Sequence, residues 1–208
     1  MLKGKFVNLR NMLIEDIPMI TKWFMENELS VFYISTSLAS TEEVKAYFEG
    51  ILKNPAKRRD FIITGKKDNI PLGMISIENI NWVHRNASLS FFLGVQGERK
   101  REYARESYIL CLDYAFSVIN LHRVEMKILA SNKPLLKLFQ DWSDFYLKDG
   151  LESIHEHEAT LKEAAFFMGE YTDFEIYAVF KERYKKLWEK THTIIKELYS
   201  TQQNKKVT

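Results

Sequence analysis

The sequence predicts a single domain of the α+β class, followed by an added C-terminal helix. Three observations lead to this prediction. Short apolar and alternating runs, typical of strands, follow one another between residues 60 and 93. An apolar helix over residues 104–119 separates them from another strand-like run at 124–129. Two later runs, 161–167 and 172–180, have the pattern of a closing hairpin, and no repeat or linker divides the chain.

The N-terminal half of the chain carries clear start signals. A first strand is predicted at residues 6–10, and a helix at residues 12–24. Ser40 is followed three residues later by Glu43, which is the pattern of a capping box and predicts that a second helix begins there. Three strand-like runs follow, at residues 60–64, 72–77 and 86–93, and they are expected to pair as antiparallel neighbours. The turn at residues 65–69 joins the first two runs as a hairpin.

The C-terminal part has weaker patterns. A short helix is predicted at residues 135–139, and the aromatic and then acidic stretch 141–158 shows little periodicity. The domain is expected to cover residues 1–183, with an amphipathic helix at 184–200 and a polar, disordered tail at 201–208. The helix could pack on its own domain or on a partner subunit, so a homodimer is one expectation.

The residues that precede the apolar helix are strongly basic. Arg99, Lys100, Arg101 and Arg105 gather four positive charges where the helix begins. The first N–H groups of a helix lack partners within it, and the helix dipole adds a partial positive charge there. Together these groups favour a bound phosphate. The alternative is a basic turn that is only solvated, and the residues alone leave both interpretations open.

The composition argues against several classes of protein. A content of 46% hydrophobic and 28% charged residues is ordinary for a globular protein, and a net charge of +2 indicates neither a nucleic-acid nor an anionic-membrane partner. The single cysteine, Cys111, lies in the apolar helix, so we expect no internal disulfide. No apolar run reaches the roughly 18 residues of a membrane span. The first residues lack a signal-peptide core, so we expect a cytoplasmic protein.

Taken in order, these segments resemble the GNAT acetyltransferase superfamily, and within it the subgroup that acetylates ribosomal-protein N-termini and polyamines. The acyl-CoA signature of the family, Gln/Arg-x-x-Gly-x-Gly/Ala, is similar to Arg99-x-x-Glu102-x-Ala104. The likeness runs from Phe6 to about Tyr184. Further matching segments are Asn8-Leu9-Arg10 with Glu15-Asp16, residues 113–116, residues 121–125, Asn132, and residues 161–163 with 169–173.

The resemblance implies a GNAT fold, which is a mixed, mostly antiparallel sheet between helices, with acetyl-CoA as cosubstrate and no metal. The backbone of Phe92, Leu93 and Gly94 would receive the pantetheine arm, and Asn132 would bond the cofactor near its thioester. The N–H groups that would surround the pyrophosphate belong to Arg99, Lys100, Arg101, Glu102, Tyr103 and Ala104. The implied activity is acetyl transfer to a primary amine of a small molecule or a peptide, namely a protein N-terminus, a polyamine or an amino sugar.

Three positions depart from the family pattern. Glu102 stands where the signature has glycine, and its bulk and charge beside the diphosphate predict weakened cofactor binding. Phe139 stands where a tyrosine often protonates the departing thiolate, and Ser88 where a carboxylate is often found. The second hypothesis is therefore a catalytically degenerate GNAT-fold protein that binds a CoA ester or serves as a protein-interaction module.

Further side chains are candidates for acid–base or metal chemistry, each with a structural alternative. Glu78, after the strand 72–77, could act through a water as the general base, or be a surface carboxylate. Tyr146 could replace the missing acid if the residues after Phe139 fold back, or it could pack in the core. The run His155-Glu-His-Glu158 has the composition of a cation site, but we expect a solvated acidic loop and no metal.

Overall fold

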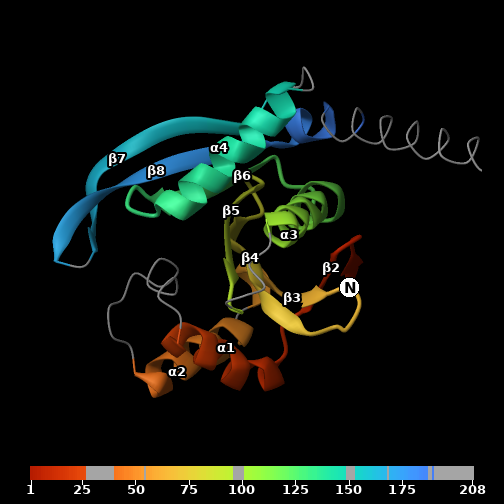
Figure 1. Ribbon diagram of the computed structural model, residues 1–208, viewed down its shortest axis with the longest axis vertical. Coiled ribbons are helices and arrows are strands. Elements are labelled where there is room, and N and C mark those ends of the chain that lie inside the picture. The colour runs from red at the N-terminus through yellow and green to blue at the C-terminus, as the bar shows by residue number, and fades with distance from the viewer. Residues whose placement is uncertain are drawn as a thin grey trace, which may run out of the picture.

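The sheet of the computed structural model contains eight strands in the order β1-β2-β3-β4-β5-β6-β8-β7 (Figure 1). The structure describes residues 1–26, 40–53, 55–95, 101–148, 153–167, 169–186 and 189, without the side chains of 26 and 144–148. Neighbouring strands are antiparallel except β5 and β6, which are parallel, so the mixed sheet is confirmed. The strands are β1 (Leu2–Lys3), β2 (Val7–Asn11), β3 (Arg59–Gly65), β4 (Pro71–Asn81), β5 (Asn86–Leu93), β6 (Arg123–Leu129), β7 (His155–Phe167) and β8 (Glu170–Phe180).

Helices cover both faces of the sheet (Figure 1). The longer ones are α1 (Ile17–Glu26), α2 (Thr41–Leu52), α3 (Arg101–Asp113) and α4 (Lys133–Lys148). Residues of α1 and α2 form one core cluster with Ile62, Met74 and Phe92 of the sheet. Residues of α3 and α4 share a second cluster with the opposite face, including Ile75 and Leu89. Because side chains alternate along a strand, these two sets point to opposite faces.

The capping box and the apolar helix, which depend on residues near each other in the sequence, are present as predicted. Ser40 Oγ accepts a hydrogen bond from the Glu43 N–H at 3.2 Å, and the Glu43 carboxylate accepts from the Ser40 N–H at 2.7 Å, so the capping box is confirmed. The predicted apolar helix is α3 together with a π-helical turn, Tyr114–Val118. Cys111 is fully buried, and burial raises the pKa of its thiol, which therefore packs as a small apolar group.

The prediction of a solvated acidic loop at residues 155–158 is wrong, and the short helix predicted at residues 135–139 is longer in the structure. The helix that was predicted to end at residue 139 continues to Lys148, because Phe139 and Trp142 lie on one helix face and are both buried. Strand β7 already begins at His155, since its backbone pairs with β8 from Val179 onward. The closing hairpin is confirmed and is longer than its predicted runs.

The chain after β8 turns into a helix, of which residues 181–186 are described. Tyr184 in this helix is buried, and its ring centroid lies 5.3 Å from that of Phe116. Apart from residue 189, the remainder of the predicted helix 184–200 and the tail 201–208 lie outside the described residues. Among the helices that the structure describes, none is long and apolar enough to span a membrane.

Candidate active site

Strands β5 and β6 separate along their length, and a wedge opens between them. Their parallel ladder joins residues 86–88 to residues 123–125 and, in the described part of the chain, goes no further. Beyond this point β5 stays on β4, and β6 stays on β8. Since the edges of residues 89–93 and 126–129 do not bond to each other, their peptide groups can bond to an extended ligand that enters the wedge.

A row of polar side chains crosses three strands at the closed end of the wedge. Glu78 of β4 is opposite Ser88 in the ladder, and Ser88 is opposite Glu125 of β6. Partners in a ladder point to one face, which here is the face that α1 and α2 cover. Ser88 Oγ donates to Glu125 Oε1 at 3.3 Å, and the side chains of Glu78 and Glu125 are 20% and 47% exposed. Arg123 Nη2 lies 3.6 Å from Glu125 Oε2, so the Glu125 charge is shared with one cation, and the two carboxylates of the row together still favour a further cation.

Glu78 is fixed in place by hydrogen bonds. Arg58 Nη2 donates to Glu78 Oε1 at 2.9 Å, and Ser90 Oγ donates to the same oxygen at 2.5 Å. Arg58 also binds Asp60 through Nε and Nη2, at 3.0 Å each to Oδ1, and Asp60 accepts a further bond from Ser76 Oγ at 2.6 Å. Charge-assisted bonds of this kind restrict the geometry of the carboxylates. The Glu78 carboxylate is therefore held within a hydrogen-bonded network and is not a freely solvated surface group.

The first turn of α3 lies close to the open end of the wedge. Tyr103 of this turn lines a cavity together with Leu72 of β4. The carbonyl oxygen of Leu72 accepts a hydrogen bond at 2.9 Å from the N–H of Gly94, directly after β5 ends. The N-terminal N–H groups and the positive dipole end of a 13-residue helix are thus next to the wedge, where they favour an anion.

Four rings fill the space between α3, α4 and β7. Tyr108, Phe139, Trp142 and His155 are each at most 8% exposed. Ring centroids lie 4.5 Å apart for Phe139 and His155, and 5.8 Å apart for Tyr108 and Phe139. Tyr108 Oη lies 3.0 Å from His155 Nε2, and burial lowers the pKa of His155 to about 3, so the imidazole is neutral at pH 7. Phe91, in the diverging half of β5, lies 6.3 Å from Tyr108 between ring centroids.

Comparison with known proteins decides the family. Residues 7–141 match the family model described as an acetyltransferase (GNAT) domain. The chain belongs to the GNAT acetyltransferase family. As a GNAT enzyme, it transfers an acetyl group from acetyl-CoA to a primary amine.

Individual relatives are distant in sequence and similar in fold. The chain is 21% identical over 178 residues to spermidine N(1)-acetyltransferase of Vibrio cholerae, which covers 86% of this chain and 95% of that protein. It is 24% identical over 149 residues to the uncharacterized N-acetyltransferase p20 of Bacillus licheniformis, with 70% and 81% covered. The crystal structure of spermidine N-acetyltransferase from Vibrio cholerae in complex with CoA and spermine has a TM-score of 0.73 at 19% identity, over 87% of this chain and 99% of that chain. The GNAT fold is thereby confirmed.

The residues that match the GNAT acyl-CoA signature are partly described. Arg101, Glu102, Tyr103 and Ala104 form the first turn of α3, and Glu102 is exposed there, while Arg99 and Lys100 lie outside the described residues. An acidic residue in the first turn of a helix favours its dipole. The position of Glu102 therefore has a structural reason besides any effect on the cofactor.

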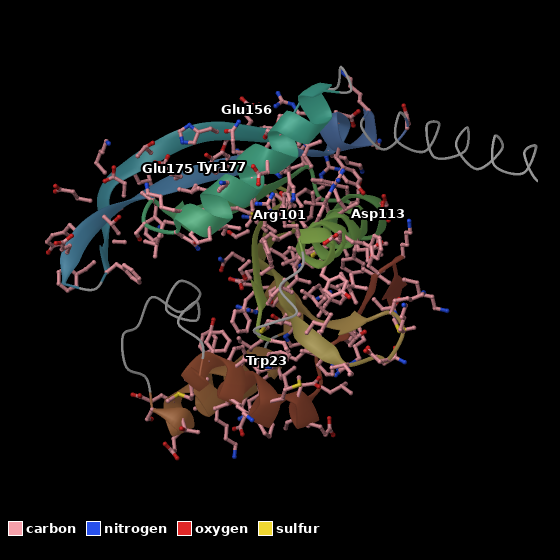
Figure 2. All side chains as sticks on the ribbon, viewed as in Figure 1. Trp23, Arg101, Asp113, Glu156, Glu175 and Tyr177 are labelled. Carbon is pink, nitrogen blue, oxygen red and sulfur yellow. The ribbon has the colours of Figure 1, made fainter. Side chains whose placement is uncertain are left out.

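Side chains of α1 pack against residues 92–94, whose backbone is predicted to receive the pantetheine arm. Phe92 is buried, with its ring centroid 6.2 Å from that of Trp23 and 5.1 Å from that of Phe24. A Cβ atom built on Gly94 would lie 2.4 Å from the Trp23 ring, so only glycine allows the indole to pack there. Figure 2 shows Trp23 on α1, at this side of the sheet.

Asn132 starts α4, as a capping residue. Its Oδ1 accepts from the Leu135 N–H at 3.2 Å, and its carbonyl oxygen accepts from the Leu136 N–H at 3.1 Å. Through this cap Asn132 fixes where α4 leaves the end of β6. Tyr146 lies further along α4, and its side chain is outside those that the structure describes.

Sequence reasoning missed Glu125, Tyr108 and His155 as candidates. Glu125 belongs to an alternating run, Tyr108 to an apolar helix, and His155 to a stretch that was interpreted as an acidic loop. His157, two residues on, binds Glu175 Oε2 at 2.6 Å through Nε2 and is not paired with His155. Within the described residues, no group of three or more His, Cys, Asp or Glu side chains could hold a metal ion.

Proposed function

We propose that this acetyltransferase acts on a polyamine, an acceptor with several positive charges at neutral pH. The observation that carries the proposal is the row of Glu78, Ser88 and Glu125 at the closed end of the wedge. Two carboxylates in one row attract an ammonium group and hold it beside the place where a thioester in the wedge would end. The Vibrio cholerae relative is named for spermidine, which supports the same class of acceptor.

Acetyl-CoA supplies the acetyl group as a thioester. We propose that its pantetheine arm lies along the edge formed by Phe92, Leu93 and Gly94, and that its diphosphate lies at the first turn of α3. The N–H groups of residues 101–104 would hold the diphosphate, together with Arg99 and Lys100. Asn132 would form a hydrogen bond to the cofactor near its thioester. The geometry that supports this placement is the separation of β5 from β6 and the proximity of Tyr103 to Leu72.

Glu78 is the proposed general base. A polyamine arrives as an ammonium ion, and its nitrogen becomes a nucleophile only after it loses a proton. Arg58 and Ser90 fix the Glu78 carboxylate by bonds to Oε1, so it can orient a water molecule that carries the proton away from the amine. Glu125 is more exposed and is proposed to hold the incoming ammonium before transfer.

Tyr108 is the proposed acid, in place of Phe139 and of Tyr146. When the carbon–sulfur bond breaks, its electron pair stays on sulfur, and the thiolate needs a proton. His155 Nδ1 is buried with no hydrogen-bond partner among the described atoms, and a buried N–H without a partner is costly, so we assign the imidazole proton to Nε2. Nε2–H then donates to Tyr108 Oη and stabilises the tyrosinate that remains after Tyr108 protonates sulfur.

Thiol release measured with a panel of amines tests the proposed function. We expect turnover with spermidine and spermine, and less with an amino sugar or a peptide N-terminus. Glu78→Gln should lower kcat roughly 10²- to 10⁴-fold, and Glu125→Gln should raise KM for the polyamine. Glu182→Gln, on a 75% exposed side chain, is the matched control. Acetyl-CoA binding without thiol release for any amine would instead support a degenerate CoA-ester-binding module.

We also infer that the chain associates with copies of itself through the β7–β8 hairpin. The tip of this hairpin extends beyond α4 (Figure 1), and β7 is an edge strand. Near its tip, Phe166 and Tyr171 are 64% and 70% exposed, with ring centroids 5.3 Å apart. A Vibrio cholerae relative has been solved as a dodecamer. Light scattering should show an oligomer that Phe166→Ser with Tyr171→Ser dissociates, and a monomeric wild type would refute this inference.

A further inference from the structure

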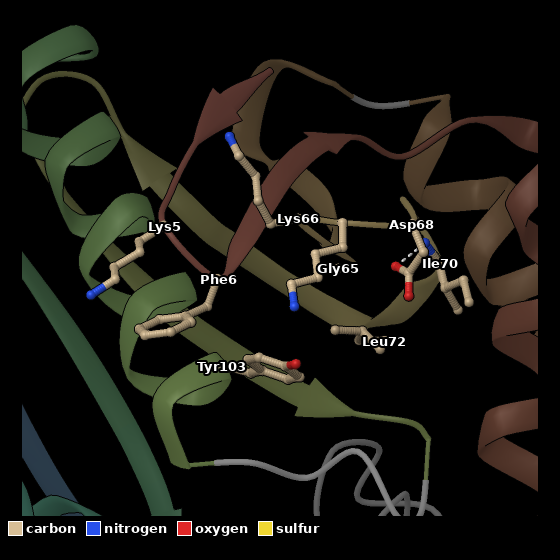
Figure 3. Close-up of a pocket in the computed structure, with 9 residues that line it drawn as sticks. Lys5, Phe6, Gly65, Lys66, Asp68, Ile70, Leu72 and Tyr103 are labelled. Carbon is tan, nitrogen blue, oxygen red and sulfur yellow. Dashed lines mark hydrogen bonds between the residues drawn. The ribbon is translucent and has the colours of Figure 1, made fainter.

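Asp60 begins a second polar row, beside the row that contains Glu78. In the ladders Asp60 of β3 is opposite Ser76 of β4, and Ser76 is opposite Ser90 of β5. Ser76 lies two residues before Glu78 on one strand, so both rows point to the face that α1 and α2 cover. None of these four residues lines the cavity beside Tyr103 of α3 (Figure 3). The second row is therefore a feature of the acceptor side of the sheet.

One guanidinium is shared between the two rows. Arg58, directly before β3, donates to Asp60 through Nε, at 3.0 Å to Oδ1 and 3.1 Å to Oδ2, and through Nη2, at 3.0 Å to Oδ1. The same Nη2 donates to Glu78 Oε1 at 2.9 Å. Three contacts thus join Arg58 to Asp60, and one joins it to Glu78. Because all four are bonds between charged groups, Asp60 is the principal partner of the guanidinium.

Neighbouring groups keep the guanidinium in this position. The Asp60 and Arg58 side chains are 7% and 15% exposed. Ser76 is fully buried, and its Oγ donates to Asp60 Oδ1 at 2.6 Å. The hydroxyl oxygen of Tyr47, on α2, accepts a hydrogen bond from Arg58. Charges with so little exposure are weakly screened by solvent, so the removal of one of them changes the potential at the others.

The charges of Arg58, Asp60 and Glu78 do not cancel. One positive and two negative charges sum to one negative charge. With a neutral residue at position 60, Arg58 and Glu78 would form a pair without net charge. The guanidinium would then repel an incoming ammonium ion and largely offset its attraction to the Glu78 carboxylate. The charge of Asp60 prevents this cancellation.

We propose that Asp60 determines the preference of this enzyme for cationic acceptors, by holding Arg58 so that the Glu78 carboxylate attracts the ammonium group. The inference rests on the proposed function, in which Glu78 meets the acceptor. Asp60 itself acts through Arg58 and is a positioning residue. Since the effect is electrostatic, it depends on the sum of the charges at positions 58 and 60.

Variants that remove these two charges singly and together test the proposal, in steady-state assays of thiol release with spermidine. Asp60→Asn should raise KM for spermidine roughly tenfold and leave KM for acetyl-CoA unchanged, and the effect should shrink in high salt. Adding Arg58→Gln restores the net negative charge, so KM should return close to the wild-type value. kcat should fall in the double variant, because Glu78 loses a bond that orients it. A purely structural role would make the double variant worse than Asp60→Asn in both constants.

Arg58→Gln alone gives an independent result if Asp60→Asn does not fold. It removes the competing cation and an orienting bond, so KM for spermidine and kcat should both fall. Asp16→Asn is the matched control. Asp16 is 10% exposed and binds Arg10 at 2.6 Å, and Arg10 belongs to β2, one strand further from the wedge than Asp60. This control should leave KM for spermidine unchanged.

The outcomes separate this proposal from the proposed function. A wild-type KM for spermidine in Asp60→Asn, or a still higher KM in the double variant, would overturn the role of Asp60 and leave acetyl transfer intact. If the wild type releases no thiol with any amine, acetyl transfer fails, and spermine is titrated calorimetrically into the same variants with CoA present. Affinities that are highest for Arg58→Gln and lowest for Asp60→Asn would then support the role of Asp60, and equal affinities or no binding would overturn it.

Discussion

Arg101 Nη1 lies 2.7 Å from Asp141 Oδ2, and this ion pair joins the first turn of α3 to the middle of α4. α3 contacts β2 and β4, whereas Phe139 of α4 contacts Tyr177 of β8, so the pair spans the line along which β5 and β6 separate. Figure 2 shows Arg101 between the two helices. A carboxylate thus engages a cation at the place where the diphosphate is proposed to bind.

Asp141→Asn is expected to tighten acetyl-CoA binding, because Arg101 would no longer have to leave a carboxylate to meet the diphosphate. Arg101 is 70% exposed, and an exposed pair contributes at most about 1 kcal/mol, so the dissociation constant should fall by up to about fivefold. Calorimetry measures this, and the effect should shrink in high salt. Asp113→Asn, at the opposite end of α3, is the control. Unchanged affinity in Asp141→Asn would show that the pair does not compete with the cofactor.

Glu102→Gly is expected to tighten acetyl-CoA binding as well, through the loss of a negative charge and of a Cβ beside the diphosphate. Glycine also costs about 1 kcal/mol of helix stability, so the midpoint of thermal unfolding should fall slightly without ligand. Glu102→Gln separates the two causes, since it removes the charge and keeps the bulk. Equal affinities for the wild type and both variants would contradict the account of the signature given above.

Tyr108→Phe is expected to lower kcat roughly 10²- to 10⁴-fold and to leave acetyl-CoA binding unchanged, because only proton delivery to sulfur is lost. Phe139→Tyr in the same background should restore part of kcat, since it returns a hydroxyl to the family's usual position. Circular dichroism checks that both variants fold. A double variant no faster than Tyr108→Phe alone, or a wild-type kcat in Tyr108→Phe, would refute the assignment of the acid.

The free energy of unfolding should depend on pH through His155. Burial holds the pKa of His155 at about 3 in the fold, against 6.5 in an unfolded chain. Between these values the unfolded chain binds a proton that the folded chain does not, so stability falls with pH below 6.5, by up to about 1.4 kcal/mol per pH unit. Urea unfolding at pH 7.5, 6.5 and 5.5 should show a shallower dependence for His155→Gln. Parallel curves would contradict this coupling.

Much of the fold follows from interactions between residues near each other in the chain. The Ser40–Glu43 capping box spans three residues, and the buried face of α3 around Cys111 repeats every three or four residues. The signature from Arg99 to Ala104 is equally local, and with the order of the other segments it led to the family. Such patterns can be interpreted without tertiary contacts, because a helix or a turn brings exactly these neighbours together.

The chemistry of the candidate site was decided by tertiary structure. Ser88 and Glu125 are 37 residues apart and meet because β5 and β6 pair, while Tyr108 and His155 are 47 residues apart and meet between α3, α4 and β7. The stretch containing His155 was interpreted as a loop because its sequence has little periodicity. It forms a strand because its backbone pairs with β8 from Val179 onward. The sequence alone determined the family and most helices and strands. Strand pairing and helix packing selected which carboxylates and hydroxyls share one site, because contacts at that separation leave no local pattern.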